Sequence, residues 1–241
     1  RLAKIYGGTM ILRNYMYTAP EYFTREEVAQ IHQHAVKVPL DVGRTGRGEG
    51  DPDGPPVDEN HSADAGIRQS KVKWFTSPGE YQMPENIVQK INDVVNQGMQ
   101  ESGWNFDLSW TENFQYTIYD YNPDLPTGDY YTWHTDHGGE VHVDPNGLSH
   151  HRKLSMTIQL SDPLDYEGGK FQWLEPNPQF DRIKFGDKQF DLDKGIRTLP
   201  FSAQAIGSIC LFPSWLYHQV TPVTRGRRVS IVGWYNGPPW T

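Results

Sequence analysis

Tyr131-Thr-Trp-His134-Thr-Asp136 places a histidine and an aspartate two residues apart within a run of aromatic and β-branched residues. Such a run is typical of a β-strand. Because strand side chains alternate between two faces, His134 and Asp136 are predicted to point the same way and to offer two ligands to one metal ion. Two ligands do not make a site, so a third is expected from a distant part of the chain.

His218 is the strongest candidate for the third ligand. It lies in Phe212-Pro-Ser-Trp-Leu-Tyr-His-Gln-Val-Thr-Pro222, where two prolines bracket a short extended segment. Two histidines and one carboxylate on one face of an iron ion leave three positions open, as oxygen activation with a chelating co-substrate requires. The same ligands also suit Zn(II) and an activated water, so a zinc hydrolase is the rival enzyme class.

Arg228 opens the alternating sequence Arg-Val-Ser-Ile-Val-Gly-Trp234 and is predicted to point inward with Ser230. A buried arginine requires an anion. Its planar guanidinium matches a carboxylate, to which Ser230 could add a hydroxyl group. The alternative is a solvated hairpin tip, which is what we expect for the neighbouring Arg225 and Arg227.

Taken in order, His134-x-Asp136, His218 and Arg228 resemble the iron(II)/2-oxoglutarate-dependent dioxygenases. The chain is more closely similar to the prolyl-4-hydroxylase-like branch that includes the bacterial PKHD-type hydroxylases. In that branch a Lys or Arg ten residues after the second histidine holds the distal carboxylate of 2-oxoglutarate. The resemblance runs from about Phe23 to Trp234 and includes Ile67-Arg-Gln-Ser70, Gln115-Tyr-Thr-Ile-Tyr119, Asp162-Pro-Leu-Asp-Tyr-Glu-Gly168-Gly169-Lys-Phe and Thr221-Pro-Val-Thr-Arg225-Gly-Arg-Arg228-Val-Ser.

The resemblance implies Fe(II), 2-oxoglutarate and O₂ as cofactor and co-substrates, with ascorbate as a candidate reductant. It implies that 2-oxoglutarate is converted to succinate and CO₂ while a substrate C–H bond is hydroxylated. In the related halogenases the carboxylate position is a small residue, so Asp136 favours hydroxylation. The substrate expected for the family is a prolyl residue of a protein or peptide. A free amino acid or another small molecule is the alternative.

Several aromatic residues have roles that the resemblance implies and core packing could equally explain. Tyr119 aligns with a tyrosine that hydrogen-bonds the co-substrate, with Tyr121 as its competitor because the turn that follows is longer than usual. Tyr131 repeats another family position. Trp173 and Trp234 lie on strands that would line the barrel, where either could contact substrate.

Two segments are predicted to be loops. Residues 39–65 are rich in Gly, Pro and Asp, which predicts a mobile loop; in the family such a loop often closes over substrate, and a plain solvated insertion is the alternative. The histidine-rich segment His137–His151 invites a second-metal hypothesis. Its irregular Gly and Pro spacing does not preset ligand geometry, so we favour a solvated loop at the pocket mouth.

Two helices are expected before a β-rich region. The capping signature Thr24-x-x-Glu27 begins a helix from about Thr24 to Val36, and Pro84 begins a second that ends near Gly98. One strand is expected at 67–75, and eight more at about 113–121, 130–136, 153–161, 169–174, 197–202, 207–212, 216–223 and 227–235. This order favours a mainly β (α+β) jelly roll with both helices packed on one sheet. The resemblance implies the same cupin-like double-stranded β-helix.

Length and composition limit the remaining possibilities. The 241 residues suffice for one domain, expected at 10–241, and the opening residues 1–9 before Met10 could be vector-derived. A net charge of −8 with scattered basic residues argues against nucleic acid as partner. A lone cysteine, Cys210, and the lack of a long apolar run favour a cytoplasmic protein without a membrane partner. A non-catalytic jelly-roll binding module is the non-enzyme alternative.

Overall fold

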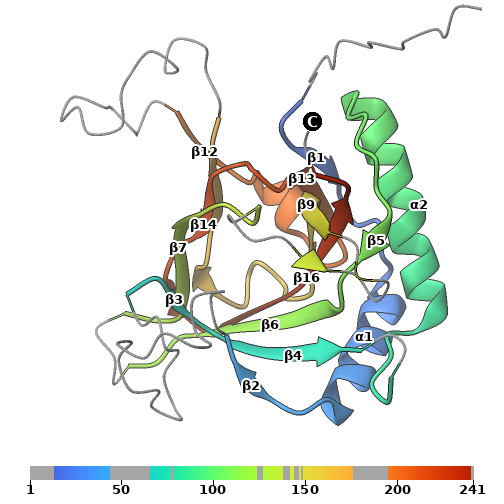
Figure 1. Ribbon diagram of the computed structural model, residues 1–241. Helices are drawn as coiled ribbons and strands as arrows, with labels where there is room; N and C mark the ends of the chain where they lie inside the picture. The colour runs from blue at the N-terminus through green and yellow to red at the C-terminus, as the bar shows by residue number, and fades with distance from the viewer. Residues whose placement is uncertain are drawn as a thin grey trace, which may run out of the picture.

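A computed structural model describes residues 14–43, 66–76, 79–123, 127–137, 142–143, 147, 149–175 and 195–239. Two antiparallel sheets pack face to face as a jelly roll, which confirms the predicted fold class (Figure 1). A buried cluster that includes Cys210 and Phe212 of one sheet and Phe171 and Val220 of the other joins them. The predicted mobile loop lies outside the described residues apart from 39–43, as do residues 1–9.

The larger sheet has the strand order β1-β13-β9-β16-β6-β4-β2, with β5 on β16 and β8 on β9. Its strands are β1 (Tyr17–Ala19), β2 (Asp41–Val42), β4 (Lys71–Phe75), β5 (Trp110–Thr111), β6 (Phe114–Asp120), β8 (His142–Val143), β9 (Ser149–Gln159), β13 (Ile209–Pro213) and β16 (Arg227–Gly237). The smaller sheet has the order β12-β11-β14-β7-β3. Its strands are β3 (Arg68–Gln69), β7 (Tyr130–His134), β11 (Phe171–Leu174), β12 (Ile196–Thr198) and β14 (His218–Val220). The strands β10 (Glu167–Gly168) and β15 (Val223–Arg225) pair separately.

Helix α1 (Arg25–Lys37) begins as the sequence predicts. The Thr24 hydroxyl accepts a hydrogen bond from the Glu27 amide at 3.2 Å, and the Glu27 carboxylate accepts one from the Thr24 amide at 2.7 Å. This reciprocal pair satisfies two of the amide groups that a helix start otherwise leaves open. The apolar face of α1 packs against the outer face of the larger sheet.

Helix α2 (Glu85–Ser102) extends past the predicted end at Gly98. It stops instead at Gly103, which adopts the left-handed conformation (φ 71°) that favours glycine. A side chain at Gly98 would overlap Leu211 and Tyr17, so this glycine lets the helix approach the larger sheet closely. Both helices share one hydrophobic core with that sheet, as predicted.

Several strand boundaries differ from the prediction. The expected strand 67–75 is two strands, because the chain passes at Ser70 from the smaller sheet, where β3 pairs with β7, to the larger, where β4 pairs with β6. The segment 216–223 is likewise divided between β14 and β15, and 197–202 ends in a 3₁₀ turn (Phe201–Gln204). Strand β9 begins at Ser149 and β8 is His142–Val143, so the last three residues of the predicted loop His137–His151 and two residues in its middle are in strands. Among the described residues, no helix is long and apolar enough to cross a membrane.

Gly207 makes a close backbone contact with Phe23, just before α1, and the importance of this contact for stability can be tested. Its φ of 80° is unfavourable for other residues, and an added Cβ would overlap the carbonyl oxygen of Phe23, whose amide donates to Gly207 O at 2.9 Å. We therefore expect Gly207→Ala to lower the free energy of unfolding by at least about 2 kcal/mol, measured by urea denaturation. The matched control is Gly66→Ala, where nothing lies within 4 Å of the added carbon and the change should be about 0.5 kcal/mol or less. Equal effects of the two substitutions would contradict this account.

Candidate metal and co-substrate site

The two predicted histidines and the predicted aspartate meet between the sheets. His134 and His218 are direct register partners on β7 and β14. Their Nε2 atoms each lie 3.6 Å from an oxygen of the Asp136 carboxylate, and the three candidate ligand atoms all lie within 4.8 Å of one another. This spacing matches a site in which three ligands approach one ion from one side.

Backbone carbonyl groups fix the orientation of both imidazole rings. His134 Nδ1 donates to the carbonyl oxygen of Thr132 at 2.7 Å, and His218 Nδ1 donates to that of Leu216 at 2.8 Å. A carbonyl oxygen only accepts, so each Nδ1 carries the proton and each Nε2 presents its lone pair toward Asp136. This is the tautomer that a metal site with Nε2 ligands requires, and the donor set therefore fits Fe(II).

The surroundings also favour the protonation states that metal binding needs. Burial lowers the pKa of His218 to about 4, so this ring is neutral at pH 7. Burial would raise the pKa of Asp136, but attraction to His218 and His134 in their protonated forms outweighs it, so this pKa is held below its usual range. Neutral imidazole and ionised carboxylate are the forms that coordinate a metal, so His218 and Asp136 are already in their binding forms at neutral pH.

Asp136 reaches the site from a turn and not from a strand, which corrects the sequence prediction. Strand β7 ends at His134, and the amide groups of Asp136 and His137 both donate to the carbonyl oxygen of Ser214 at 2.9 Å. The Ser214 hydroxyl is in turn hydrogen-bonded to that of Ser155 at 2.9 Å. Strand alternation therefore does not place the carboxylate; a contact with the segment before β14 does.

Arg228 points into the same pocket and is 2% exposed, in agreement with the inward orientation predicted from the sequence. Its guanidinium donates to Gln159 Oε1 at 3.0 Å and to the Ser230 hydroxyl at 3.4 Å, and lies 5.6 Å from the centre of the Tyr119 ring. These partners are neutral, and no acidic side chain in the described ranges forms an ion pair with Arg228. A buried guanidinium among neutral groups requires an anion.

Gln159 adds a second open donor beside that guanidinium. Its Oε1 accepts from Arg228, while its buried Nε2 has no partner in the described part of the chain. A buried donor without a partner costs about 1–3 kcal/mol, and a carboxylate could accept from both Gln159 and Arg228. The residues at this end of the pocket therefore fit the distal carboxylate of 2-oxoglutarate.

The predicted aromatic site residues differ in whether they line the pocket. Tyr119 is 3% exposed and lines the pocket, whereas Tyr121 is 45% exposed, so Tyr119 is the tyrosine at the site. The Tyr131 ring stacks on His134 with 3.4 Å between ring centres. Trp234 lines the pocket with a buried Nε1 that has no described partner, while Trp173 is absent from the lining and packs beside Phe171 and its neighbours.

Two arginines near the triad, the buried Arg68 and the largely buried Arg152, were missed by sequence reasoning. Arg152 lies over the Trp234 ring at 4.1 Å, binds both oxygens of Glu112 at 2.6 and 2.7 Å, and reaches the Asp136 carbonyl oxygen at 3.5 Å. Arg68 lines the pocket and lies 4.9 Å from the centre of the Tyr131 ring. For Arg68, strand alternation along Arg68-Gln-Ser70 could have indicated that its side chain faces inward. No sequence pattern indicated the position of Arg152, whose partner Glu112 is 40 residues away.

The Glu112–Arg152 pair should contribute measurably to stability because both side chains are largely buried (13% and 20% exposed). We expect Glu112→Gln to lower the free energy of unfolding by about 1.5–3 kcal/mol in urea denaturation, since it leaves Arg152 without its counter-charge. The exposed pair Glu175–Arg197 (41% and 49% exposed) is the matched control, and Glu175→Gln should cost at most about 1 kcal/mol. A larger loss for the exposed pair would refute this ranking.

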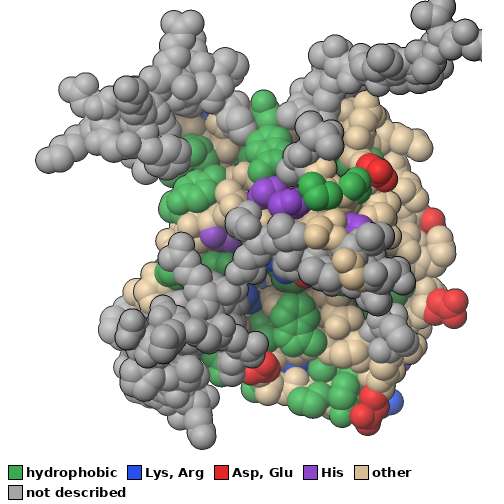
Figure 2. Space-filling view, viewed as in Figure 1, with side chains coloured by type: hydrophobic (Ala, Val, Ile, Leu, Met, Phe, Trp, Pro, Cys, Tyr) green, Lys and Arg blue, Asp and Glu red, His purple; other side chains and the backbone are tan. Residues whose placement is uncertain are grey.

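The remaining histidines do not form a second ligand cluster within the described residues; the triad is the one group of metal-ligating side chains found there. The rings of His137 and His151 stack with 5.2 Å between centres, and His150 Nδ1 is hydrogen-bonded to the Ser109 hydroxyl at 3.1 Å. On the face of the molecule seen in Figure 2, histidine side chains lie between hydrophobic ones.

Fold and site together define a class of protein: a jelly roll built around two histidines, one aspartate and a buried arginine. A family model described as the 2OG-Fe(II) oxygenase superfamily matches residues 114–236, a little over half of the chain. The chain therefore belongs to the 2OG-Fe(II) oxygenase superfamily. Membership in this superfamily implies Fe(II) as cofactor and 2-oxoglutarate and O₂ as co-substrates, as the sequence predicts.

Curated relatives place the chain near the PKHD-type hydroxylases. It is 34% identical over 96 residues to such a protein from Paraburkholderia phytofirmans, covering 40% of this chain and 34% of the relative. A Synechococcus PKHD-type hydroxylase is 35% identical over 109 residues, covering 44% and 36%. The matched part of the chain spans about a third of the length of these relatives.

Solved structures share the fold at low sequence identity. A prolyl-4-hydroxylase from Pseudomonas putida superposes with a TM-score of 0.56 at 16% identity, covering 93% of this chain and 94% of that one. A Trichoplax adhaerens prolyl hydroxylase, solved with a peptide fragment of hypoxia inducible factor, gives 0.56 at 16% identity, covering 92% and 83%. These likenesses confirm the architecture.

Proposed function

We propose that this oxygenase hydroxylates a prolyl residue of a protein or peptide and releases succinate and CO₂, with residues 10–241 acting as one catalytic domain. The observation that carries the proposal is the buried Arg228 beside the His134, Asp136 and His218 triad, in one pocket lined from both sheets. The prolyl substrate is supported by the PKHD-type names of the relatives and by the fold shared with prolyl hydroxylases.

His134, Asp136 and His218 would hold Fe(II), and Arg228 with Gln159, Ser230 and Tyr119 would hold 2-oxoglutarate. When bound, the iron and the co-substrate supply the oxidising chemistry that converts a C–H group and O₂ to an alcohol. The carbonyl oxygens behind His134 and His218 keep both Nε2 atoms aimed at one point.

The pocket walls orient the substrate and exclude water. Tyr131 stacks on one metal-ligand candidate and Phe171 on the other, at 3.4 and 5.4 Å between ring centres, so neither imidazole is open to solvent on that face. The unpartnered Trp234 N–H in the same pocket would donate to an acceptor on the substrate. Trp173 on β11 is the register partner of His218 on the neighbouring strand β14 and would support its ring.

A zinc hydrolase gives no role to the buried Arg228 or to the open Gln159 amide, and a non-catalytic binding module gives none to the convergence of His134, Asp136 and His218. The deciding experiment titrates the metal-free protein with Fe(II) and then 2-oxoglutarate under anaerobic conditions and records the visible absorption spectrum. A charge-transfer band that saturates near one equivalent supports the chelated co-substrate. No band in folded, metal-binding protein would remove the oxygenase proposal.

Substrate class is tested separately, by incubation with Fe(II), 2-oxoglutarate and air, with and without ascorbate. Proline-containing peptides and free proline are compared for succinate formation and for a mass gain of one oxygen atom. Hydroxylation of the peptide alone supports the prolyl-residue proposal. Hydroxylation of free proline alone would replace it with the amino-acid alternative.

A further inference from the structure

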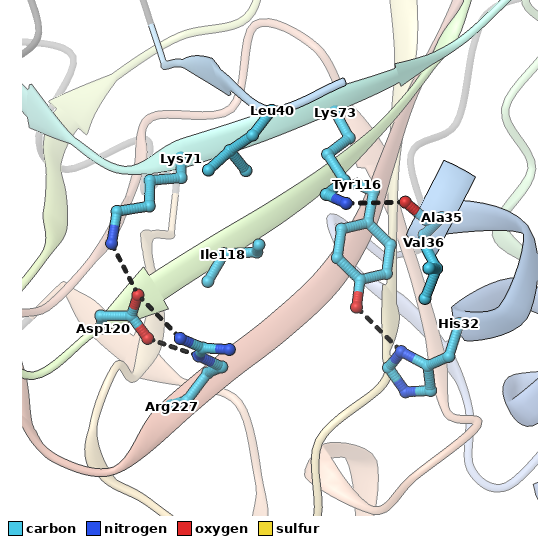
Figure 3. A pocket seen from close by; sticks show the side chains of 10 residues that line it. All are labelled: His32, Ala35, Val36, Leu40, Lys71, Lys73, Tyr116, Ile118, Asp120 and Arg227. Carbon is cyan, nitrogen blue, oxygen red and sulfur yellow. Dashed lines mark hydrogen bonds and ion pairs between the residues drawn. The ribbon is translucent and has the colours of Figure 1, made fainter. Parts of the chain in front are cut away.

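A second hollow lies on the outer face of the larger sheet, opposite the metal and co-substrate site (Figure 3). Strand β6 contributes to both, because Tyr116, Ile118 and Asp120 point outward into the hollow while Gln115 and Tyr119 point inward to the co-substrate pocket. The hollow has a volume of about 390 Å³. This volume is within the range of small-molecule sites.

Apolar side chains form its floor and one edge. Ile118 lies at the floor and is 8% exposed, while Val36 and Leu40, where α1 ends and the chain turns toward β2, are 78% and 56% exposed. Exposed large hydrophobic residues are few in the described part of the chain, and two of them border this one hollow. An apolar group placed here would remove that surface from water.

The polar part of the hollow carries more positive than negative charge. Lys71 lies 3.0 Å from Asp120, and Arg227 binds the same carboxylate, so one acid is shared by two bases. Lys73 donates from Nζ to the Ala35 carbonyl oxygen at 2.7 Å, which uses one of its three N–H groups. Among the described residues, three cations and one carboxylate therefore line the hollow, in a chain whose net charge is −8.

At the far end of the hollow, the described residues add no negative charge. His32 Nε2 donates to the Leu160 carbonyl oxygen at 3.4 Å, so its Nδ1 accepts from the Tyr116 hydroxyl at 2.8 Å. Burial lowers the pKa of His32 and raises that of Tyr116 to about 12, which leaves both rings neutral at pH 7. An anion in the hollow would meet no repulsion from this end.

We propose that this hollow binds a small amphiphilic carboxylate, with the carboxylate group at Lys73 and the apolar body over Ile118, Val36 and Leu40. An inorganic anion would not cover the apolar side chains of the hollow. A neutral apolar molecule would not pair with its excess positive charge. The proposal does not depend on the substrate assigned to the metal site.

The test is a titration of the full chain with octanoate and, separately, with the uncharged octanamide, followed by ¹H–¹⁵N NMR. Octanoate should shift the amide signals of Val36, Leu40 and Ile118 and bind at least about tenfold more tightly than octanamide, because an ionic hydrogen bond is lost in the amide. Saturating 2-oxoglutarate should not displace it.

Two variants and a control sharpen the result. Val36→Glu, at an exposed helix position where folding is not at risk, and Lys73→Gln should each weaken octanoate binding at least about tenfold. Arg25→Gln removes a cation from the exposed start of the same helix and should leave binding unchanged. Absence of these shifts, equal affinity for octanamide, or displacement by 2-oxoglutarate would overturn the proposal.

Discussion

Asp136→Asn is expected to weaken Fe(II) binding at least about 100-fold and to abolish succinate formation. Changes in residues that merely orient a metal ligand typically cost 10–100-fold in affinity, and this substitution neutralises a ligand itself. Asp136 is also the one negative charge between the two imidazole rings, 3.6 Å from each Nε2. Co(II) absorption in anaerobic titrations measures the affinity without depending on turnover.

The control for this prediction is Asp93→Asn on the exposed face of α2, where the carboxylate accepts from the Gln89 side chain at 3.0 Å. That variant should bind Co(II) and form succinate as the parent protein does. Circular dichroism establishes that both variants are folded. Undiminished Co(II) affinity in folded Asp136→Asn protein would remove Asp136 from the ligand set.

Arg228→Gln is expected to raise the KM for 2-oxoglutarate by roughly 30-fold or more, with metal affinity unchanged. Truncating one partner of a buried hydrogen-bonded charge pair costs about 2–5 kcal/mol, and each 1.4 kcal/mol corresponds to about tenfold. Because the guanidinium is 2% exposed and has neutral partners, its loss should cost the ligand-free protein little stability. The thermal shift produced by 2-oxoglutarate gives a second readout without turnover.

Arg225→Gln is the matched control for the co-substrate prediction. Arg225 lies three residues from Arg228 and pairs with Glu167 at 2.9 Å, where both side chains are about 60% exposed (60% and 62%). This variant should keep the parent KM. If both substitutions raised the KM equally, the effect would be one of general surface charge and Arg228 would not be the anchor.

Much of the architecture follows from local pattern. The Thr24–Glu27 capping pair begins α1 where predicted, and alternation along β16 points Arg228 and Ser230 into the pocket. These features depend on residues close in sequence, whose spacing fixes the face they share. The end of α2 was predicted wrongly because Gly98 serves close packing, a role that its sequence context does not distinguish from helix termination.

The sequence by itself determined the fold class and the types and order of the candidate ligand residues, because residue chemistry and hydrophobic pattern need no knowledge of distant contacts. Tertiary structure decided how those residues meet. The Ser214 carbonyl brings Asp136 to the triad from a turn, the pairing of β7 with β14 brings His218 beside His134, and burial selects Tyr119 over Tyr121. Arg152 and Gln159 gain their positions from strands that pair across the sheet, and such pairing depends on the packing of the whole chain.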